Sequence, residues 1–147
     1  MMDAAVMERT TDATVRIGSM ELRFRVETPE LVMFDFVVPA DAKVPAPHYH
    51  ESVDEAVYGL SGTMTTTVDG TRHEVRAGDV VHIPRGAVHH HANLHAETAK
   101  VLIVLTPGSI GRAYFEEMAA ALRNPGPPDM DVLLGIMRRH GLVPAKG

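Results

Sequence analysis

Three histidines and one glutamate form the pattern with the clearest chemical meaning in this 147-residue chain: His48, His50, Glu55 and His89. Side chains two positions apart on a β-strand point to the same face, so His48 and His50 can present two imidazoles to one point. A carboxylate and a third imidazole would complete a site. Such a donor set suits Fe(II), Mn(II), Zn(II), Ni(II) or Cu(II). The pattern predicts a metal site with coordination positions left open for a substrate.

The composition excludes several other chemistries. The chain has no cysteine, which rules out disulfides, thiolate metal sites and cysteine nucleophiles. Its formal net charge is -5 and it has no run of Lys or Arg, so we expect no nucleic-acid partner. It also has no glycine-rich phosphate loop and no nucleophile-elbow pattern around a serine. The sequence therefore argues against a phosphate-binding loop and against acyl transfer by a serine triad.

No segment of the sequence has the length and apolarity of a membrane span. Residues 1–16 include acidic side chains and lack an apolar core, and the longest apolar stretch, 101–105, is far too short to cross a bilayer. We therefore expect a cytoplasmic protein with no membrane partner.

The sequence predicts that these side chains are held by β-strands, which we expect between about residues 15 and 107. The most distinct hairpin joins 63–68 to 72–76 through Asp69-Gly70, a strong two-residue turn signal. The other expected strands include 20–27, 31–38, 80–83, 88–93 and 99–105. Roughly eight short strands between turn residues predict an all-β fold of the closed or rolled barrel type.

The character of the chain changes after Pro107. Residues 114–122 have apolar side chains at helical spacing, and a second helix follows the Pro-rich segment 124–128, with Asp129 or Asp131 as its cap. We interpret this helix pair as packing against the outer face of the barrel, with a lid or a partner-binding pair as the alternative. The prediction is one domain over 1–147, with the barrel at about 15–107 and helices at about 112–140.

Two segments of the chain resemble the motifs of the cupin superfamily. The first motif reads His48, Tyr49, His50, Glu55 and Gly62. The second reads Gly78, Pro84, Arg85, Gly86, His89 and Asn93 and matches at every fixed position. The resemblance covers about 32–107 and is closest to small single-domain cupins similar to quercetin dioxygenase-like proteins. It implies a double-stranded β-helix, or jelly-roll barrel, with a short C-terminal helical extension, and it implies a homodimer.

Carried over position by position, the resemblance implies that one divalent ion per chain is bound by His48, His50, Glu55 and His89. Glu51 and Asp54 lie close to the carboxylate position. Glu55 is favoured over both because Tyr58 follows it by three residues, as is common in the family. The glycine that usually opens the first motif is Ala42 here.

Other residues near the motifs have predicted roles. His91 has the strand parity of His89, so it is expected to line the cavity as an acid, a base or an alternative ligand, and His90 should face away. Gly62, Gly78 and Gly86 are expected at corners of the backbone. The remaining histidines are expected to be structural or solvated: His73, His82, His95 and His140.

Three functions fit these features. The first is a metal-dependent oxidoreductase of the dioxygenase type acting on a small organic molecule, in which the resemblance implies that Glu55 takes the substrate hydroxyl proton. The second is an isomerase, cyclase or lyase that uses the ion only as a Lewis acid. The third is a non-enzymatic module that binds a small molecule, because a fold and a metal site do not by themselves establish a reaction.

Overall fold

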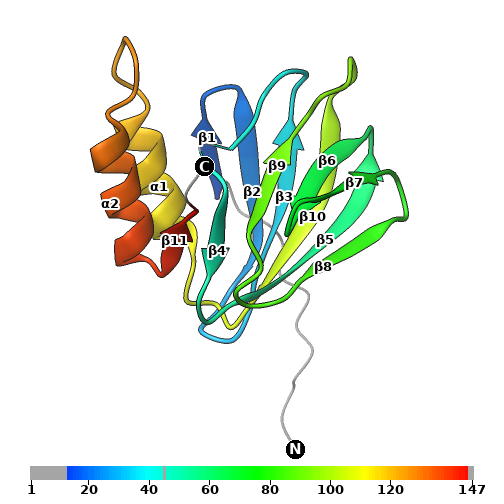
Figure 1. The fold of residues 1–147 in the computed structure, drawn as a ribbon, viewed down its shortest axis with the longest axis horizontal. Helices are drawn as coiled ribbons and strands as arrows, with labels where there is room; N and C mark the ends of the chain where they lie inside the picture. Colours follow the sequence, from blue (N-terminus) through cyan, green and yellow to red (C-terminus); the bar gives the residue numbers. More distant parts are fainter. Residues whose placement is uncertain (1–12, 45, 146–147) are drawn as a thin grey trace, which may run out of the picture.

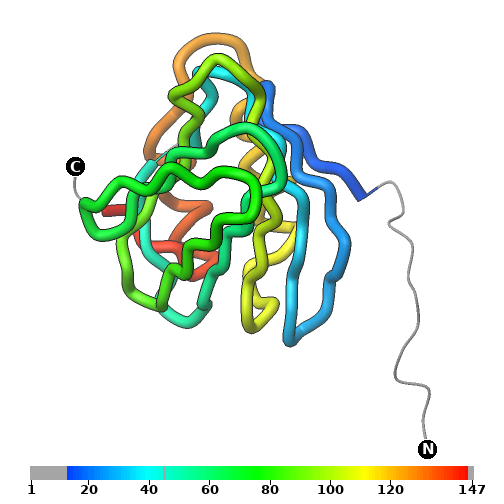
Figure 2. Tube along the Cα trace, turned by 90° about the vertical axis from the view of Figure 1, so that its right-hand side faces the viewer, coloured from blue at the N-terminus to red at the C-terminus, as the bar shows by residue number. Residues whose placement is uncertain are grey.

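The computed structural model describes residues 13–44 and 46–145, and two facing β-sheets make up most of it (Figures 1 and 2). One sheet has the strand order β1 (Thr14–Ile17), β2 (Met20–Glu27), β3 (Val32–Val38), β10 (Ala99–Thr106), β5 (Asp54–Ser61) and β8 (Val80–Ile83). The other has the order β11 (Leu142–Pro144), β4 (His48–His50), β9 (His89–Ala92), β6 (Met64–Val68) and β7 (Thr71–Val75). All strand pairs are antiparallel, and the two sheets confirm the predicted cupin jelly-roll fold with its C-terminal helices.

The core lies between the two sheets and follows from side-chain alternation along the strands. In β10 every second residue from Ala99 to Leu105 is buried, and β3 buries Val32, Phe34, Phe36 and Val38 in the same way. The predicted hairpin is confirmed between β6 and β7, where Asp69 and Gly70 both have positive φ, 46° and 83°. That turn geometry matches the twist of the flanking strands.

Two helices close one side of the barrel, α1 (Arg112–Ala121) and α2 (Met130–Arg139). The α2 helix begins at Asp129, whose side chain accepts hydrogen bonds from the amides of Asp131 and Val132. In Figure 1 the pair stands beside β1, β4 and β11, and β1 and β11 are edge strands of the two sheets.

The prediction that these helices pack on the outer face is wrong. Tyr114 and Met118 of α1 and Met137 of α2 are buried and line the cavity inside the barrel. The physical reason is that β1 and β11 do not pair with each other, so the apolar interior would be open to water on this side. The helices supply the missing wall, as the alternative lid interpretation expected.

A short strand after α2 was not predicted. Here Leu142 lies opposite His50 and Pro144 opposite His48, so β11 extends the sheet beside the strand that bears the first two histidines. Three residues carry too little pattern to reveal a strand from sequence. Among the residues that the structure describes, no helix has the length and hydropathy needed to cross a membrane.

Candidate metal centre

Three histidines meet where β4 and β9 run side by side. Cα of His48 lies opposite that of His89, and the alternation along β4 turns His48 and His50 to the same buried face. The ring centroids are separated by 4.6 Å for His48 and His89, 4.8 Å for His50 and His89, and 5.1 Å for His48 and His50. The candidate ligand atoms of the three side chains all lie within 4.8 Å of one another.

The backbone holds two of these rings in a fixed orientation. His48 Nδ1 donates a hydrogen bond to the Ala46 carbonyl at 2.9 Å, and His89 Nδ1 donates to the Ala87 carbonyl at 3.0 Å. Because a carbonyl can only accept, Nδ1 carries the proton in both rings, and the Nε2 atom is left to act as a ligand. Such carbonyl partners are typical of histidines that bind metal ions.

The turn before β9 brings His89 to its place. Gly86 has a φ of 83°, as predicted for a corner residue, and its amide donates to the His50 carbonyl at 2.9 Å. The other predicted corners, Gly62 and Gly78, also have positive φ, 64° and 88°. Beyond β9, the buried Asn93 side chain donates to the carbonyls of Val38 and Glu97, which fixes the end of the strand.

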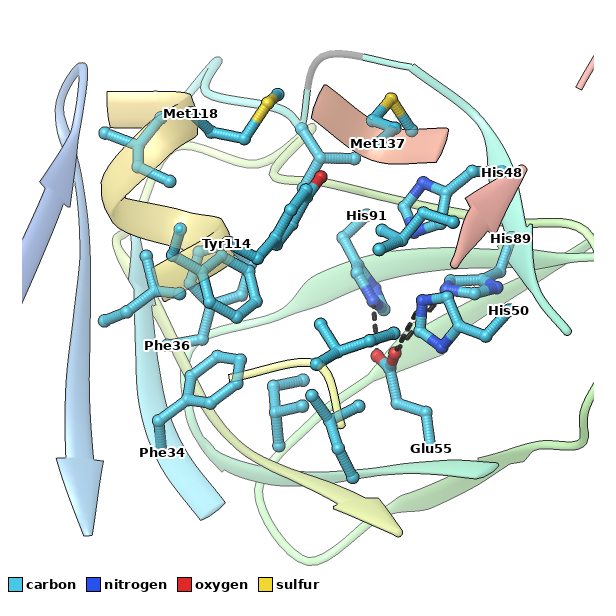
Figure 3. A pocket seen from close by; sticks show the side chains of 18 of the residues that line it. Phe34, Phe36, His48, His50, Glu55, His89, His91, Tyr114, Met118 and Met137 are labelled. Carbon is cyan, nitrogen blue, oxygen red and sulfur yellow. Dashed lines mark hydrogen bonds and ion pairs between the residues drawn. The ribbon is translucent and has the colours of Figure 1, made fainter. Parts of the chain in front are cut away.

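Glu55 reaches the histidines from the opposite sheet, on β5. Its Oε1 atom lies 3.5 Å from Nε2 of His89 and 3.9 Å from Nε2 of His50. Its Oε2 atom lies 2.8 Å from Nε2 of His91, within hydrogen-bond distance. Figure 3 shows the carboxylate between His91 on one side and the other histidines on the other.

The two neighbouring acids lie outside this cluster. Glu51 is exposed, and Asp54 accepts a hydrogen bond from the Arg85 amide and pairs with the Arg85 side chain. Side-chain alternation explains the difference, because Asp54 and Glu55 must face opposite sides of β5. The structure therefore brings Glu55, and neither alternative, to the histidines.

His91 lies beside the cluster, as the strand parity predicted. With Glu55 ionised, His91 Nε2 is the donor of their hydrogen bond, and Nδ1 pairs with the Thr66 hydroxyl at 3.0 Å. His90 faces away and its Nε2 donates to the Val44 carbonyl. The remaining histidines lie outside the cluster; His95 pairs with Glu74 and His140 with Glu117.

Burial sets the charge of the cluster. Desolvation lowers the pKa of His48 to about 3 and that of His50 to about 4, so both imidazoles are neutral near pH 7. Burial works to raise the pKa of Glu55, but the neighbouring His89 and His91 outweigh it and hold that pKa well below its usual range. The same carboxylate raises the pKa of His89 against the effect of burial. A neutral His48 and His50 beside an ionised carboxylate are protonation states that a divalent ion requires.

An unpartnered buried nitrogen supports the presence of an ion. His89 Nε2 and His50 Nδ1 are both fully buried, and within the described ranges neither has a hydrogen-bond partner; His89 Nε2 is the one that faces Glu55. Glu55 Oε1, at 3.5 Å, is too distant for a good hydrogen bond. A polar atom left without a partner costs stability unless something unseen satisfies it. Three imidazoles and one carboxylate around this atom fit a divalent transition metal.

The cluster forms one end of a cavity enclosed by both sheets and both helices (Figure 3). About 80 Å³ of it is open to the centres of water-sized molecules, room for several waters or a compact organic molecule. The rest of the wall is almost wholly apolar and includes Phe34, Phe36, Ile103 and Leu105. The arrangement can hold an ion at one end and a small ligand against it.

Sequence reasoning missed two polar residues of this region, Thr66 and Tyr114. Thr66 stands in a β-branched run that indicates only a strand, and its partner His91 is 25 residues away. Tyr114 belongs to the apolar stripe of a helix, a pattern that normally means core packing. Neither has a local signal that separates it from its neighbours.

Comparisons with known proteins point to one family. Residues 34–105 match the family model described as a cupin domain. The chain is 39% identical over 61 residues to quercetin 2,3-dioxygenase of Bacillus subtilis, a match that covers 42% of this chain and 18% of that enzyme.

Solved structures show the same fold. A conserved protein with a double-stranded β-helix domain from Klebsiella pneumoniae has a TM-score of 0.60 at 23% identity, covering 71% of this chain and 95% of that one. The polyketide cyclase RemF of Streptomyces resistomycificus has a TM-score of 0.58 at 24% identity, covering 70% of this chain and 80% of that one. At these identities the likeness establishes the fold alone.

Proposed function

This chain carries a cupin domain, and from that premise we infer that it is a metal-dependent oxidoreductase of the dioxygenase type acting on a small organic molecule. The observation that supports this most is the position of the histidine–glutamate cluster at the end of an enclosed, apolar cavity. His48, His50, Glu55 and His89 would hold one divalent ion, with the cavity as the place for the substrate.

A bound Fe(II), Mn(II), Ni(II) or Cu(II) would supply redox chemistry and a positive charge beside the substrate oxygens. Glu55 is placed to take the proton of a substrate hydroxyl, and the hydrogen bond that His91 Nε2 donates to its second oxygen would hold the carboxylate in place for that transfer. The apolar walls exclude water that would compete for the site. The reaction balances without an added reductant, because the substrate supplies the electrons and both atoms of O2 enter the product.

A second candidate uses the same residues without O2. This would be an isomerase, cyclase or lyase in which an ion held by the same cluster acts only as a Lewis acid on a carbonyl group. Glu55 would again move a proton, now between two carbon or oxygen atoms of one substrate. Zinc would suit this role because it has no redox chemistry.

Two measurements on the same untagged preparation test the proposal. Elemental analysis gives the metal content, and an oxygen electrode follows O2 consumption with enediols, β-diketones and flavonols. Iron, manganese, nickel or copper near one per chain with O2 uptake supports the dioxygenase. Zinc near one per chain with no uptake supports the Lewis-acid enzyme. Absence of any metal after loading attempts overturns both and leaves a small-molecule-binding module.

The homodimer implied by the family stays part of the proposal. Light scattering coupled to size-exclusion chromatography tests it: a mass near twice that of the 16.0 kDa chain is expected. A mass of one chain at micromolar concentration would overturn it.

A further inference from the structure

The cavity has two chemically different ends. Within the part of the chain that the structure describes, twenty residues line it, and five of them are His91 and the four residues of the histidine–glutamate cluster. Among the other fifteen of these described residues, Tyr114 alone carries a side-chain oxygen or nitrogen atom. No described Lys or Arg lies in this lining, so no cation from these residues neutralises a phosphate or a second carboxylate of a ligand. A ligand that fills the cavity must therefore have an uncharged, mostly apolar body.

The Tyr114 hydroxyl is available to such a ligand. The ring is buried on α1, with its centroid 4.9 Å from that of Phe115 and 5.3 Å from that of His140. No residue within the described part of the chain forms a hydrogen bond with the hydroxyl. Burial raises the pKa of Tyr114, so the phenol stays protonated and acts as a donor. A donor on a residue that lines the cavity, without a partner among the described residues, favours a ligand that supplies an acceptor.

Ion pairs fix the helix that carries this ring. Glu117, one turn after Tyr114 on α1, pairs with Arg139 at 3.0 Å and with His140, which joins α1 to the end of α2. Arg112 at the start of α1 pairs with Glu27 of β2 at 2.9 Å. Figure 3 shows the Tyr114 ring on the other side of the pocket from Glu55 and His50, with its hydroxyl directed toward Met137. A fixed donor opposite the cluster can select a ligand by the place of its polar atoms.

We propose that Tyr114 is a specificity-determining residue that donates a hydrogen bond to a neutral oxygen of the substrate. The substrate is then a compact molecule with an apolar body and a chelating pair of oxygens at the cluster. It carries one further uncharged oxygen, which accepts the hydrogen bond from Tyr114. Sugar phosphates and other dianionic molecules are excluded by the same wall. This inference rests on the proposed metal-dependent function, because the chelating end needs the ion.

The test compares matched catechols on metal-loaded protein by isothermal titration calorimetry. One pair is 3,4-dihydroxyacetophenone and 4-isopropylcatechol, which share a shape but differ in the carbonyl acceptor. The 2,3-dihydroxyacetophenone and 3-isopropylcatechol pair moves the acceptor to the adjacent ring position. The variant is Tyr114→Phe, which keeps the ring and removes the hydroxyl. The control is Tyr58→Phe on the exposed part of β5.

We expect the preference for the carbonyl probe over its isopropyl partner to fall about three- to tenfold in Tyr114→Phe for one of the pairs, and to stay unchanged in Tyr58→Phe. Because this ratio is compared between each variant and the wild type, the effect of the acetyl group on chelation cancels. The metal content of both variants must equal that of the wild-type protein. An unchanged ratio for both pairs with full metal content overturns the role of Tyr114 alone. Failure of the wild-type protein to bind metal would instead overturn the proposed function.

Discussion

Glu55 Oε2 and His91 Nε2 lie 2.8 Å apart, a hydrogen bond that joins the two sheets across the cavity. The bond leaves the other carboxylate oxygen, Oε1, facing His50 and His89. His91 is itself held by the Thr66 hydroxyl at 3.0 Å. The hydrogen bonds from Thr66 to His91 and from His91 to Glu55 therefore fix the orientation of the carboxylate. Residues that bind a metal ion commonly have such hydrogen-bond partners.

Replacing His91 by Ala should leave the metal content near that of the wild type but lower turnover about 10- to 100-fold. The physical reason is that Glu55 loses the partner of Oε2 and its fixed orientation, while the histidines of β4 and His89 remain. Elemental analysis and O2 uptake on the same sample check both parts.

The adjacent residue gives the control for this change. His90 lies on the same strand but faces away, with its Nε2 bonded to the Val44 carbonyl. His90→Ala should leave turnover within about twofold of the wild type. Equal losses in the two variants would mean that the strand, and not the His91 side chain, is responsible.

Replacing His89 by Ala should abolish most metal binding while the barrel still folds. The change removes the buried Nε2 atom, which lacks a hydrogen-bond partner among the described residues. The affinity for the metal should fall by more than about 100-fold, the upper range for removing a residue that only hydrogen-bonds to a ligand. Metal titration and far-ultraviolet circular dichroism check the two parts. His82→Ala, at an exposed position of β8, is the control and should bind metal normally. Full occupancy in His89→Ala would refute the ligand assignment.

Removing the metal with a chelator should lower the melting temperature without unfolding the protein at 25 °C. A ligand present at 100 times its dissociation constant stabilises the folded state by about 2.7 kcal/mol. For a chain of this size that corresponds to about 5–10 °C. The core of both sheets does not depend on the ion, so the circular dichroism spectrum should persist. Restored melting after metal is returned would separate this effect from damage by the chelator.

Replacing Gly59 by Ala should destabilise the protein by about 1–3 kcal/mol or more. A Cβ atom at this position would lie 1.9 Å from the Arg76 carbonyl oxygen, far inside contact distance. Because this oxygen belongs to the backbone, the segments that carry Gly59 and Arg76 would have to separate. Urea denaturation measures the loss, and a variant as stable as the wild type would contradict the close approach.

Replacing Gly135 by Ala should instead increase the stability of the protein. Gly135 lies inside α2, and a Cβ there would meet nothing within 4 Å. Glycine inside a helix costs about 0.5–1 kcal/mol relative to alanine, so the variant should be more stable by about that amount. The same urea experiment compares the two substitutions directly, and destabilisation by Gly135→Ala would show that α2 is packed more tightly there than the structure shows.

Much of the fold could be predicted because its signals are local. The alternation in 20–27 and 99–105, the Asp69-Gly70 turn and the helical spacing after Pro107 each occupy a few adjacent residues, and the structure confirms the elements they indicate. The facing of His48 and His50 is local in the same sense, because alternation along one strand turns both side chains to the same face. The same alternation correctly predicted that His91 shares the face of His89 and that His90 faces away.

The sequence by itself determined the type of elements, the cupin motifs and which side chains share a strand face, since these depend on neighbours along the chain. Only the tertiary structure decided what closes the cavity. The position of α1 and α2 and the pairing of Leu142 with His50 bring together residues some 90 positions apart, and no local pattern encodes such contacts. The same holds for Tyr114: its helix shows an apolar stripe, and packing against the barrel makes it a lining residue of the cavity whose hydroxyl has no hydrogen-bond partner among the described residues.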